Sequence, residues 1–283
     1  MLVNLKELLD FAEENKCAIG SFNFTSLESI DAIIKASEEV GHPVILSHAP
    51  VHDIFYGLED ILPIALDYAK RSKIRVCVHL DHGTNIDYIK KGILMGFTSV
   101  MYDGSSLPYD ENVKNTKQVV EFAKKYNVSV EGELGMIMSN GMEGADDKAS
   151  ENAFHTDPDL ATDYIKQTDV DCLAISFGTV HGEYVKEPNL DINVIKSVRN
   201  RNLKFPIVMH GGSGVSESDY KKVIDAGVRK INYYTYSQIA GYKGVKQLVD
   251  SSKTNYYHDV IVAAKKAMYQ DYLKTIHVFS NKS

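Results

Sequence analysis

Three histidines stand near the ends of apolar, strand-like runs and could together bind a metal ion. They are His82 in VCVHLDHG, His181 in LAISFGTVHG and His210 in PIVMHGGSG, and each is followed directly by glycine. Any one of them alone would fit a packed core position equally well. Three protein ligands with one open position form a catalytic zinc site. The spacing therefore predicts one Zn²⁺ per chain, held by imidazoles from separate strand ends.

Asp81 directly precedes the first of these histidines, so a carboxylate would lie beside the metal. A metal ion and an acid/base group together suffice to polarise a carbonyl and move a proton. The other histidines lack the same strand-end context. His79 is expected inside a strand, and the rest are expected at the surface or in supporting positions. They are His42, His48, His52, His155, His258 and His277.

Further polar residues gather at the same strand ends. They are Asn23, Asp103, Glu131, Glu133, Asn232 and Thr235. Buried carboxylates are costly unless they are paired or hydrogen-bonded. We therefore expect Asp103 or Glu133 to accept the second ring N–H of a ligating histidine and so fix its tautomer. For Glu131 and Glu133 an interior polar layer is an equally good interpretation.

The glycine run GGSG at 211–214 indicates a phosphate site. It follows an apolar run and precedes a helical pattern with Ser216 as its expected cap. Loops after the seventh and eighth strands of α/β barrels often bind phosphate, and backbone N–H groups at a helix start suit an anion. The nucleotide motifs GxxxxGK[ST] and GxGxxG are absent. A phosphorylated substrate with a carbonyl near the metal is therefore predicted.

Eight short β-rich runs must position these side chains. They read as continuous apolar segments, which is typical of strands buried on both faces of a parallel sheet. They cover 19–24, 43–48, 74–80, 98–103, 128–134, 171–177, 206–210 and 228–233. Helical patterns separate them, so a single-domain (β/α)₈ TIM barrel is predicted over 1–283. A doubly wound open sheet is the alternative.

Local signals refine this plan. A capping box from Thr25 to Glu28 opens the helix after the first strand, and Gly41 ends it. The long polar segment at about 135–156 is predicted to be a mobile loop, and a last helix is predicted at about 256–277. The tyrosines near 233–242 are expected to pack against a partner subunit.

Composition excludes several classes of protein. The net charge is −7 without a basic stripe, which argues against nucleic-acid binding. No apolar run reaches 18 residues and no signal peptide is recognisable, so a cytoplasmic protein without a membrane span is expected. Cys17, Cys77 and Cys172 lack metal-site spacing and are expected to be buried free thiols.

The chain resembles the class II, zinc-dependent ketose-bisphosphate aldolases, which cleave fructose or tagatose 1,6-bisphosphate. The resemblance extends over nearly the whole chain. It rests on GSFN (20–23), HLDHG (79–83), SVMYDGSSLPYDEN (99–112), VEGELG (130–135), SFGTVHG (176–182), HGGSG (210–214) and KIN (230–232) with Thr235.

The resemblance implies His82, His181 and His210 as zinc ligands and Asp81 as the acid/base. It also implies a phosphate site for the dihydroxyacetone phosphate half of the substrate, with other substrate contacts close by. These implied substrate-binding residues are Asn23, Gly182, Lys186, Gly211, Gly212, Ser213, Asn232 and Thr235. Members of the family are usually homodimers or homotetramers, and they often bind a monovalent cation such as Na⁺ or K⁺ near the phosphate.

Departures from the family pattern concern the far end of the substrate. Ala49 stands where a hydroxyl residue is common, and Tyr234 replaces a small or acidic residue. No arginine for a second phosphate is evident near the C-terminus, where only Lys282 is found. Glu143 is a candidate for a proton-transferring acid on the 135–156 loop.

The predicted function is cleavage of a ketose 1-phosphate or 1,6-bisphosphate to dihydroxyacetone phosphate and an aldehyde. Three alternatives remain open on the sequence. They are an aldolase for ketose 1-phosphates without a second phosphate, a metal-dependent sugar-phosphate isomerase, and a zinc-retaining sugar-phosphate-binding scaffold. Asp81 favours an enzyme, because a scaffold does not need an acid/base group beside the metal.

Overall fold

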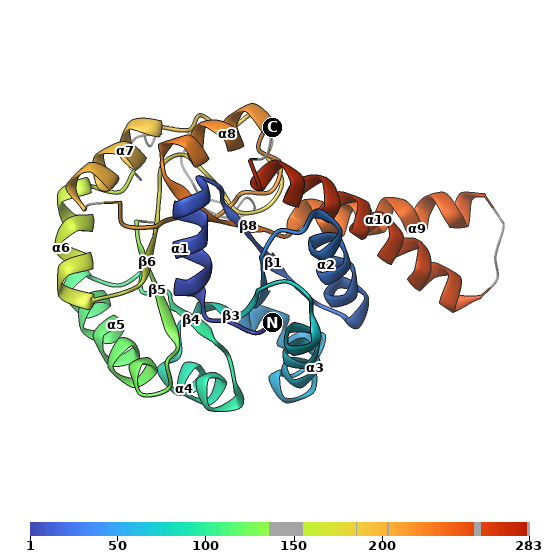
Figure 1. Cartoon of the computed structure of the whole chain (residues 1–283), viewed down its shortest axis with the longest axis horizontal. Coiled ribbons are helices and arrows are strands. Elements are labelled where there is room, and N and C mark those ends of the chain that lie inside the picture. Colours follow the sequence, from blue (N-terminus) through green and yellow to red (C-terminus); the bar gives the residue numbers. More distant parts are fainter. Residues whose placement is uncertain (136–154, 185, 203, 252–255, 282–283) are drawn as a thin grey trace.

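The computed structural model describes residues 1–135, 155–184, 186–202, 204–251 and 256–281. Within them, eight parallel strands close into one barrel in chain order (Figure 1). The strands are β1 (Ile19–Asn23), β2 (Val44–His48), β3 (Val76–Gly83), β4 (Ser99–Tyr102), β5 (Ser129–Leu134), β6 (Cys172–Ile175), β7 (Ile207–Met209) and β8 (Val228–Tyr233). The predicted (β/α)₈ barrel is confirmed, and the open-sheet alternative is wrong because β1 pairs with β8.

Helices surround the barrel and cover one of its ends (Figure 1). They are α1 (Leu5–Asn15), α2 (Leu27–Val40), α3 (Leu58–Arg71), α4 (Ile86–Met95), α5 (Tyr109–Lys124), α6 (Pro158–Thr168), α7 (Ile192–Arg201), α8 (Glu217–Ala226), α9 (Thr235–Asp250) and α10 (Tyr257–Phe279). A short 3₁₀ turn, η1 (Pro50–Ile54), joins β2 to α3. The described part of the chain contains no helix long and apolar enough to cross a membrane.

The helix ends follow the local sequence, with one shift of register. Gly41 adopts the left-handed conformation that ends α2, as predicted. The capping box of α2 lies one residue later than predicted, between Ser26 and Ser29. Ser29 Oγ accepts from the backbone N–H of Ser26, and this contact takes the place expected for Glu28. Ser216 caps α8 and accepts from the Asp219 N–H.

The barrel interior changes from apolar to polar along the strands. Residues two apart share a side of a strand, so β3 aligns Cys77, His79 and Asp81 along one line. Cys77 belongs to an apolar cluster that α1 covers with Leu5, Leu8 and Leu9. Asp81, at the carboxyl end of the strand, instead lines a cavity. The amino end of the barrel is therefore closed by apolar side chains, and the site lies at the opposite end, as is usual for this fold.

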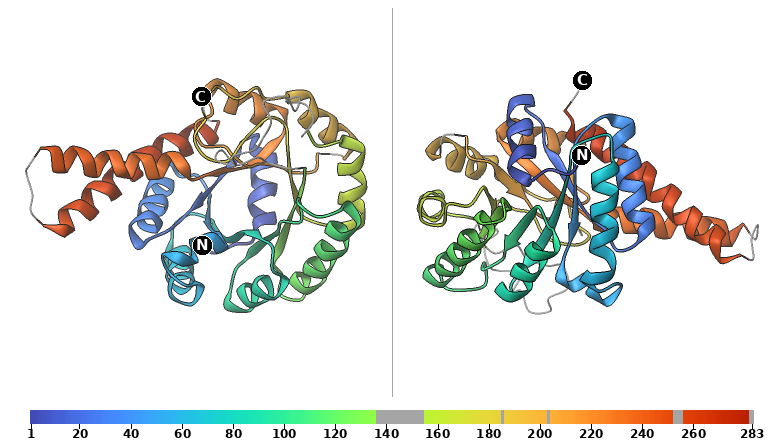
Figure 2. Two further views of the ribbon diagram at one scale, coloured as in Figure 1. Left: turned by 180° about the vertical axis from the view of Figure 1, so that it is seen from behind. Right: turned by 60° about the horizontal axis from the view of Figure 1, so that its bottom comes forward.

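The last two helices leave the barrel as a projecting arm. Figures 1 and 2 show α9 and the first part of α10 extending together beyond the ring of helices, while the end of α10 returns beside β1. Tyr242, Tyr256 and Tyr257 are exposed on this arm. The helix predicted at 256–277 corresponds to α10. The loop predicted at about 135–156 lies almost wholly outside the described residues, as does Glu143.

Candidate active site

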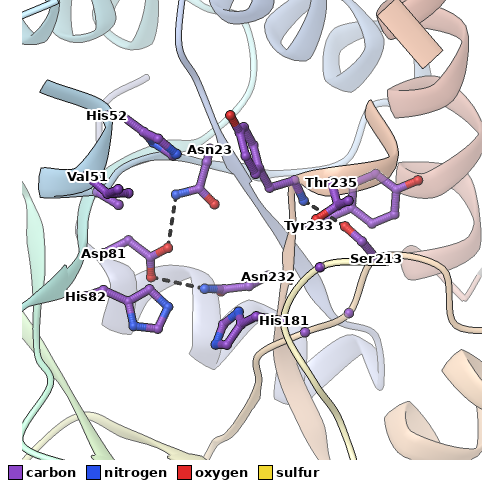
Figure 3. A pocket seen from close by; sticks show the side chains of 15 residues that line it. Asn23, Val51, His52, Asp81, His82, His181, Ser213, Asn232, Tyr233 and Thr235 are labelled. Atoms are coloured by element: carbon purple, nitrogen blue, oxygen red, sulfur yellow. Dashed lines mark hydrogen bonds between the residues drawn. The ribbon is translucent and has the colours of Figure 1, made fainter. Parts of the chain in front are cut away.

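A cavity of about 240 Å³ opens at the carboxyl end of the barrel (Figure 3). Strands β1, β3 and β8 and the loops after β2, β6, β7 and β8 all contribute to its wall. Its lining residues are Asn23, Ala49, Val51, His52, Asp81, His82, His181, Gly182, Gly211, Gly212, Ser213, Asn232, Tyr233, Tyr234 and Thr235. Most of the residues expected from the sequence to act chemically therefore meet in one place.

The three histidines offer nitrogen atoms that all lie within 4.8 Å of one another. His82 Nε2 is 3.1 Å from His210 Nδ1, and the His181 ring centroid is 5.1 Å from that of His82. His82 has a positive φ of 49°, a strained conformation for a residue other than glycine. This conformation lies in the irregular last part of β3, where the pairing with β4 shifts register between Leu80 and Gly83.

Two carboxylates orient the rings from behind. Asp103 Oδ2 lies 3.0 Å from His82 Nδ1, and Glu131 Oε1 lies 2.8 Å from His210 Nε2. A ring that donates a proton to a carboxylate presents the lone pair of its other nitrogen to a metal. These hydrogen bonds therefore direct Nε2 of His82 and Nδ1 of His210 toward each other, where each can bind a metal when it is unprotonated. The donor set, three imidazoles that converge in a cleft, fits a catalytic zinc ion.

Electrostatics differ among the three rings. Burial and the neighbouring imidazoles lower the pKa of His181 to about 3. Burial also lowers the pKa of His210. For His82, burial is outweighed by nearby carboxylates, chiefly Asp81, which raise its pKa to about 10. His181 and His210 are thus neutral near pH 7, whereas His82 holds a proton that a metal ion must displace.

Asp81 is held rigidly beside this cluster. Asn23 Nδ2 donates to its Oδ2 and Asn232 Nδ2 to its Oδ1, both at 3.0 Å (Figure 3). Asn232 in turn accepts from the buried ammonium of Lys230 at 2.7 Å. Burial disfavours the charged carboxyl, but His82 and Lys230 hold the pKa of Asp81 well below its ordinary value. Asp81 is therefore an ionised base with both oxygens positioned.

A glycine-lined wall faces the histidines from the loops after β6, β7 and β8. Gly182, Gly211 and Gly212 expose backbone there. Gly211 has a φ of 63°, and a Cβ at this position would overlap the Val180 carbonyl oxygen. Ser213 Oγ accepts from the Tyr234 N–H at 2.9 Å, which fastens this loop to the start of α9. Unobstructed backbone beside a helix start suits a phosphate group.

Some expected residues lie elsewhere. Lys186 is exposed and does not line the cavity, whereas the Tyr184 hydroxyl donates to the Gly211 carbonyl beside it. Glu133 Oε2 lies 4.0 Å from His82 Nδ1 without a hydrogen bond, so Asp103 occupies the position expected for either residue. Burial, with Asp103 as the next cause, raises the pKa of Glu133 to about 8.

Glu131 and His52 were assigned no specific role from the sequence. Glu131 shares its carboxylate between His210 and Lys230, whose Nζ lies 2.8 Å from Oε2. Its alternation with Glu133 was the available signal, but alternation alone does not show which residue meets a histidine. His52, expected at the surface or in a supporting position, is 8% exposed and lines the cavity.

Comparison with known proteins agrees with this geometry. The family model described as class II fructose-bisphosphate aldolase matches residues 3–283. The chain belongs to the class II fructose-bisphosphate aldolase family. It is 37% identical over 258 residues to the probable fructose-bisphosphate aldolase of Bacillus subtilis, covering 90% of this chain and 89% of that protein. It is 38% identical over 259 residues to the fructose-bisphosphate aldolase of Staphylococcus aureus, covering 90% and 88%.

Solved structures give the same assignment. The YdjI aldolase of Escherichia coli K12 superposes with a TM-score of 0.88 at 30% identity, covering 99% of this chain and 97% of that one. A fructose-bisphosphate aldolase structure from Campylobacter jejuni, at 21% identity and a TM-score of 0.79, shares the fold. This class II aldolase is thus a lyase of a metal-dependent family. The isomerase and scaffold alternatives are not supported.

Proposed function

We propose that the protein cleaves a ketose 1-phosphate between C3 and C4, giving dihydroxyacetone phosphate and an aldehyde. The single observation that carries this proposal is the position of Asp81. An ionised carboxylate held by two amides lies beside the three converging imidazoles, in a cavity whose opposite wall is lined by glycine. A base, a metal site and an anion site within one cavity match the needs of a retro-aldol reaction on a phosphorylated sugar.

Asp81 removes the proton of the C4 hydroxyl. The electrons of that O–H bond then form the aldehyde C=O as the C3–C4 bond breaks, and the electrons of the C–C bond pass to the C2 carbonyl. Asn23 and Asn232 hold both carboxylate oxygens, so the side chain cannot rotate away during the transfer. General base catalysis of this kind contributes roughly 10²–10⁴-fold to the rate.

His82, His181 and His210 would hold one Zn²⁺. The ion supplies Lewis-acid stabilisation of the negative charge that develops at the carbonyl group. Asp103 and Glu131 keep the donor nitrogens of His82 and His210 in the required tautomers. Cys17, Cys77 and Cys172 are buried and provide no alternative site.

The C1 phosphate would bind to the backbone of Gly182, Gly211 and Gly212 and to the hydroxyls of Ser213 and Thr235. The described cavity lining would contact this phosphate through backbone N–H groups and hydroxyls. A monovalent cation beside the phosphate remains part of the proposal. Glu143 and Lys282 lie outside the described residues.

The proposal includes a homo-oligomer in the cytoplasm. The α9–α10 arm supports self-association, because Tyr242 and Tyr257 are 67% and 78% exposed on a projecting helical pair. Exposed aromatic side chains on such a surface are typical of subunit interfaces. Sedimentation analysis of the purified protein would establish the number of subunits.

The test is an assay of zinc-loaded protein on a panel of phosphorylated ketoses, with release of triose phosphate as the readout. Asp81→Ala is expected to keep its zinc and lose activity, whereas His181→Ala is expected to lose both. Cleavage by metal-free protein, or trapping of a lysine–substrate adduct by borohydride, would contradict the proposal.

A further inference from the structure

One side of the cavity has no role in the proposed chemistry. It is the turn after β2, where Ala49, Val51 and His52 line the space (Figure 3). In this view His52 and Val51 lie across Asn23 from Ser213, and the His52 ring extends toward Asn23. A sugar with its C1 phosphate at the glycine wall and its C4 hydroxyl at Asp81 would direct its remaining carbons toward this turn.

The His52 ring is held in a defined position. Its backbone N–H donates to the Ala49 carbonyl at 2.8 Å, and its carbonyl accepts from the Phe55 N–H at 2.9 Å, so both ends of the residue are fixed within η1. Pro50 restricts the start of this turn. The ring lies 4.9 Å from the Tyr234 ring between centroids. Packing against the aromatic side chain leaves the imidazole little rotational freedom.

Neighbouring residues brace the turn. His48 Nε2 lies 2.8 Å from Asp53 Oδ1, and the Tyr88 hydroxyl donates to the same carboxylate at 2.9 Å. This ties the end of β2 and η1 to α4. A pocket wall built in this way is preorganised, because no residue must be ordered when a ligand arrives.

The imidazole itself lacks the partner that a buried polar group normally has. His52 is 8% exposed, and neither of its ring nitrogens has a hydrogen-bond partner among the described residues. Nδ1 is fully buried, so Nε2 is the nitrogen that can face the cavity and bond to a ligand there. Burial, with the neighbouring His48, lowers the pKa of His52 to about 4, so the ring is neutral near pH 7. A neutral imidazole has one donor and one acceptor, which matches a hydroxyl group.

The same wall offers no charged group for a second phosphate. Among the described residues that line the cavity there is no lysine or arginine, and the side chain of Ala49 has no hydrogen-bonding group. A phosphate dianion is recognised strongly by charge-assisted hydrogen bonds, most of all from arginine. Asp81 and Asp53 instead add negative charge near His52.

We infer that the His52 imidazole hydrogen-bonds a hydroxyl of the substrate carbons beyond C4. It thereby selects ketose 1-phosphates with an uncharged polyol tail over 1,6-bisphosphates. The inference rests on the aldol chemistry proposed above and adds its substrate class. The names of the relatives point to a bisphosphate, so the inference predicts a different substrate preference for this chain.

The test uses the zinc enzyme in the synthetic direction. C3 of dihydroxyacetone phosphate loses a proton and bonds to the aldehyde carbon, and the aldehyde oxygen gains a proton. The acceptors are D-glyceraldehyde, propanal and D-glyceraldehyde 3-phosphate. The variants are His52→Phe, which keeps a ring without hydrogen-bonding atoms, and His52→Gln, which keeps a donor and an acceptor. His258→Phe, on the exposed arm, is the matched control.

The expected result is a loss of activity toward glyceraldehyde alone. His52→Phe lowers kcat/KM for glyceraldehyde roughly tenfold, about 1.4 kcal/mol, and leaves that for propanal nearly unchanged. His52→Gln retains most of the glyceraldehyde activity, and His258→Phe equals the parent. The parent also prefers glyceraldehyde to glyceraldehyde 3-phosphate.

Two outcomes would overturn the inference alone while the enzyme remains an aldolase. In one, His52→Phe reduces kcat/KM for all three aldehydes equally, which indicates a purely structural residue. In the other, the parent prefers glyceraldehyde 3-phosphate by a hundredfold or more. A zinc-loaded parent that consumes dihydroxyacetone phosphate with none of the aldehydes would overturn the proposed function and the inference together.

Discussion

The two ends of the barrel interior are built from the same strands and serve opposite purposes. At the amino end, Cys77, Ile45 and Val208 pack against α1 without a polar atom that needs a partner. At the carboxyl end, Asp81, His210 and Asn232 occupy the same faces of the strands, and each depends on a buried hydrogen bond. Residues that stabilise the barrel and residues that do chemistry are therefore only a few positions apart along the same strands.

The largest expected effect is at the polar end. His181→Ala, or removal of zinc with a chelator, should abolish cleavage, because two imidazoles no longer provide the three protein ligands of a catalytic site. Metal content by atomic absorption and activity after dialysis measure this. Added Zn²⁺ or Co²⁺ should restore the chelated parent but not the variant. Activity in the metal-free variant would contradict the predicted dependence of cleavage on zinc.

Asp81→Asn should lower kcat by roughly 10²–10⁴-fold while zinc content and thermal stability stay near those of the parent. The amide keeps the shape of the side chain but cannot accept the hydroxyl proton. Steady-state kinetics and a melting curve of the same sample measure the two quantities. If the variant cleaves substrate at the parent rate, the proton is taken by another group.

Lys230 lies between the two ends of the barrel interior, and its loss should lower both stability and catalytic rate. Lys230→Met leaves Glu131 charged and buried without its ammonium partner, which typically costs about 3–5 kcal/mol of stability. It also removes the donor to Asn232 that helps to position Asp81. Chemical denaturation measures the first effect and kcat the second. Unchanged stability would show that water replaces the lysine.

Leu8→Ala should lower only the free energy of unfolding. Leu8 is fully buried between α1 and the amino end of the barrel, and truncation of such a leucine costs about 2–5 kcal/mol. The active site lies at the other end, so kcat and zinc content of the folded fraction should match the parent. Solvent-exposed Leu94→Ala is the control and should change neither quantity.

The smallest expected effect is the pH dependence of zinc binding. The pKa of His82 is raised to about 10, and zinc binds only the neutral ring, so metal binding to the apoprotein at pH 7 should release about one proton. Apparent zinc affinity should therefore rise about tenfold per pH unit between pH 7 and 9, and it should fall as the solution becomes more acidic. Calorimetry in buffers of different ionisation enthalpy measures the proton number. At the apolar end, the pKa of Cys77 is raised to about 12, so no thiolate competes for the ion.

Much of the fold could be predicted because local signals coincide with it. All eight predicted strand ranges overlap the strands of the structure, and the shift at α2 is one residue. Continuous apolar runs indicate strands that are buried on both faces of a sheet, and this burial can be inferred without knowing which strands pair. The family assignment is likewise confirmed.

His52 and Glu131 show where sequence reasoning stopped. His52 lies in a turn without strand periodicity, so nothing local indicates that its ring faces a cavity and contacts Tyr234, far along the chain. Glu131 and Glu133 are equivalent by alternation, yet only Glu131 reaches His210. Lys186 shows the converse, because a residue expected from the family pattern to bind substrate is exposed and does not line the cavity.

The sequence by itself determined where the strands lie along the chain, the residues available for chemistry and the face of each strand that carries them, since these follow from side-chain period and local caps. Only the tertiary structure decided which carboxylate orients which imidazole and which side chain faces the far end of the substrate. Hydrogen bonds such as those from Asn23 and Asn232 to Asp81 join residues up to 151 positions apart, and their geometry is set by closure of the barrel. Local sequence contains no information on distances across a closed sheet.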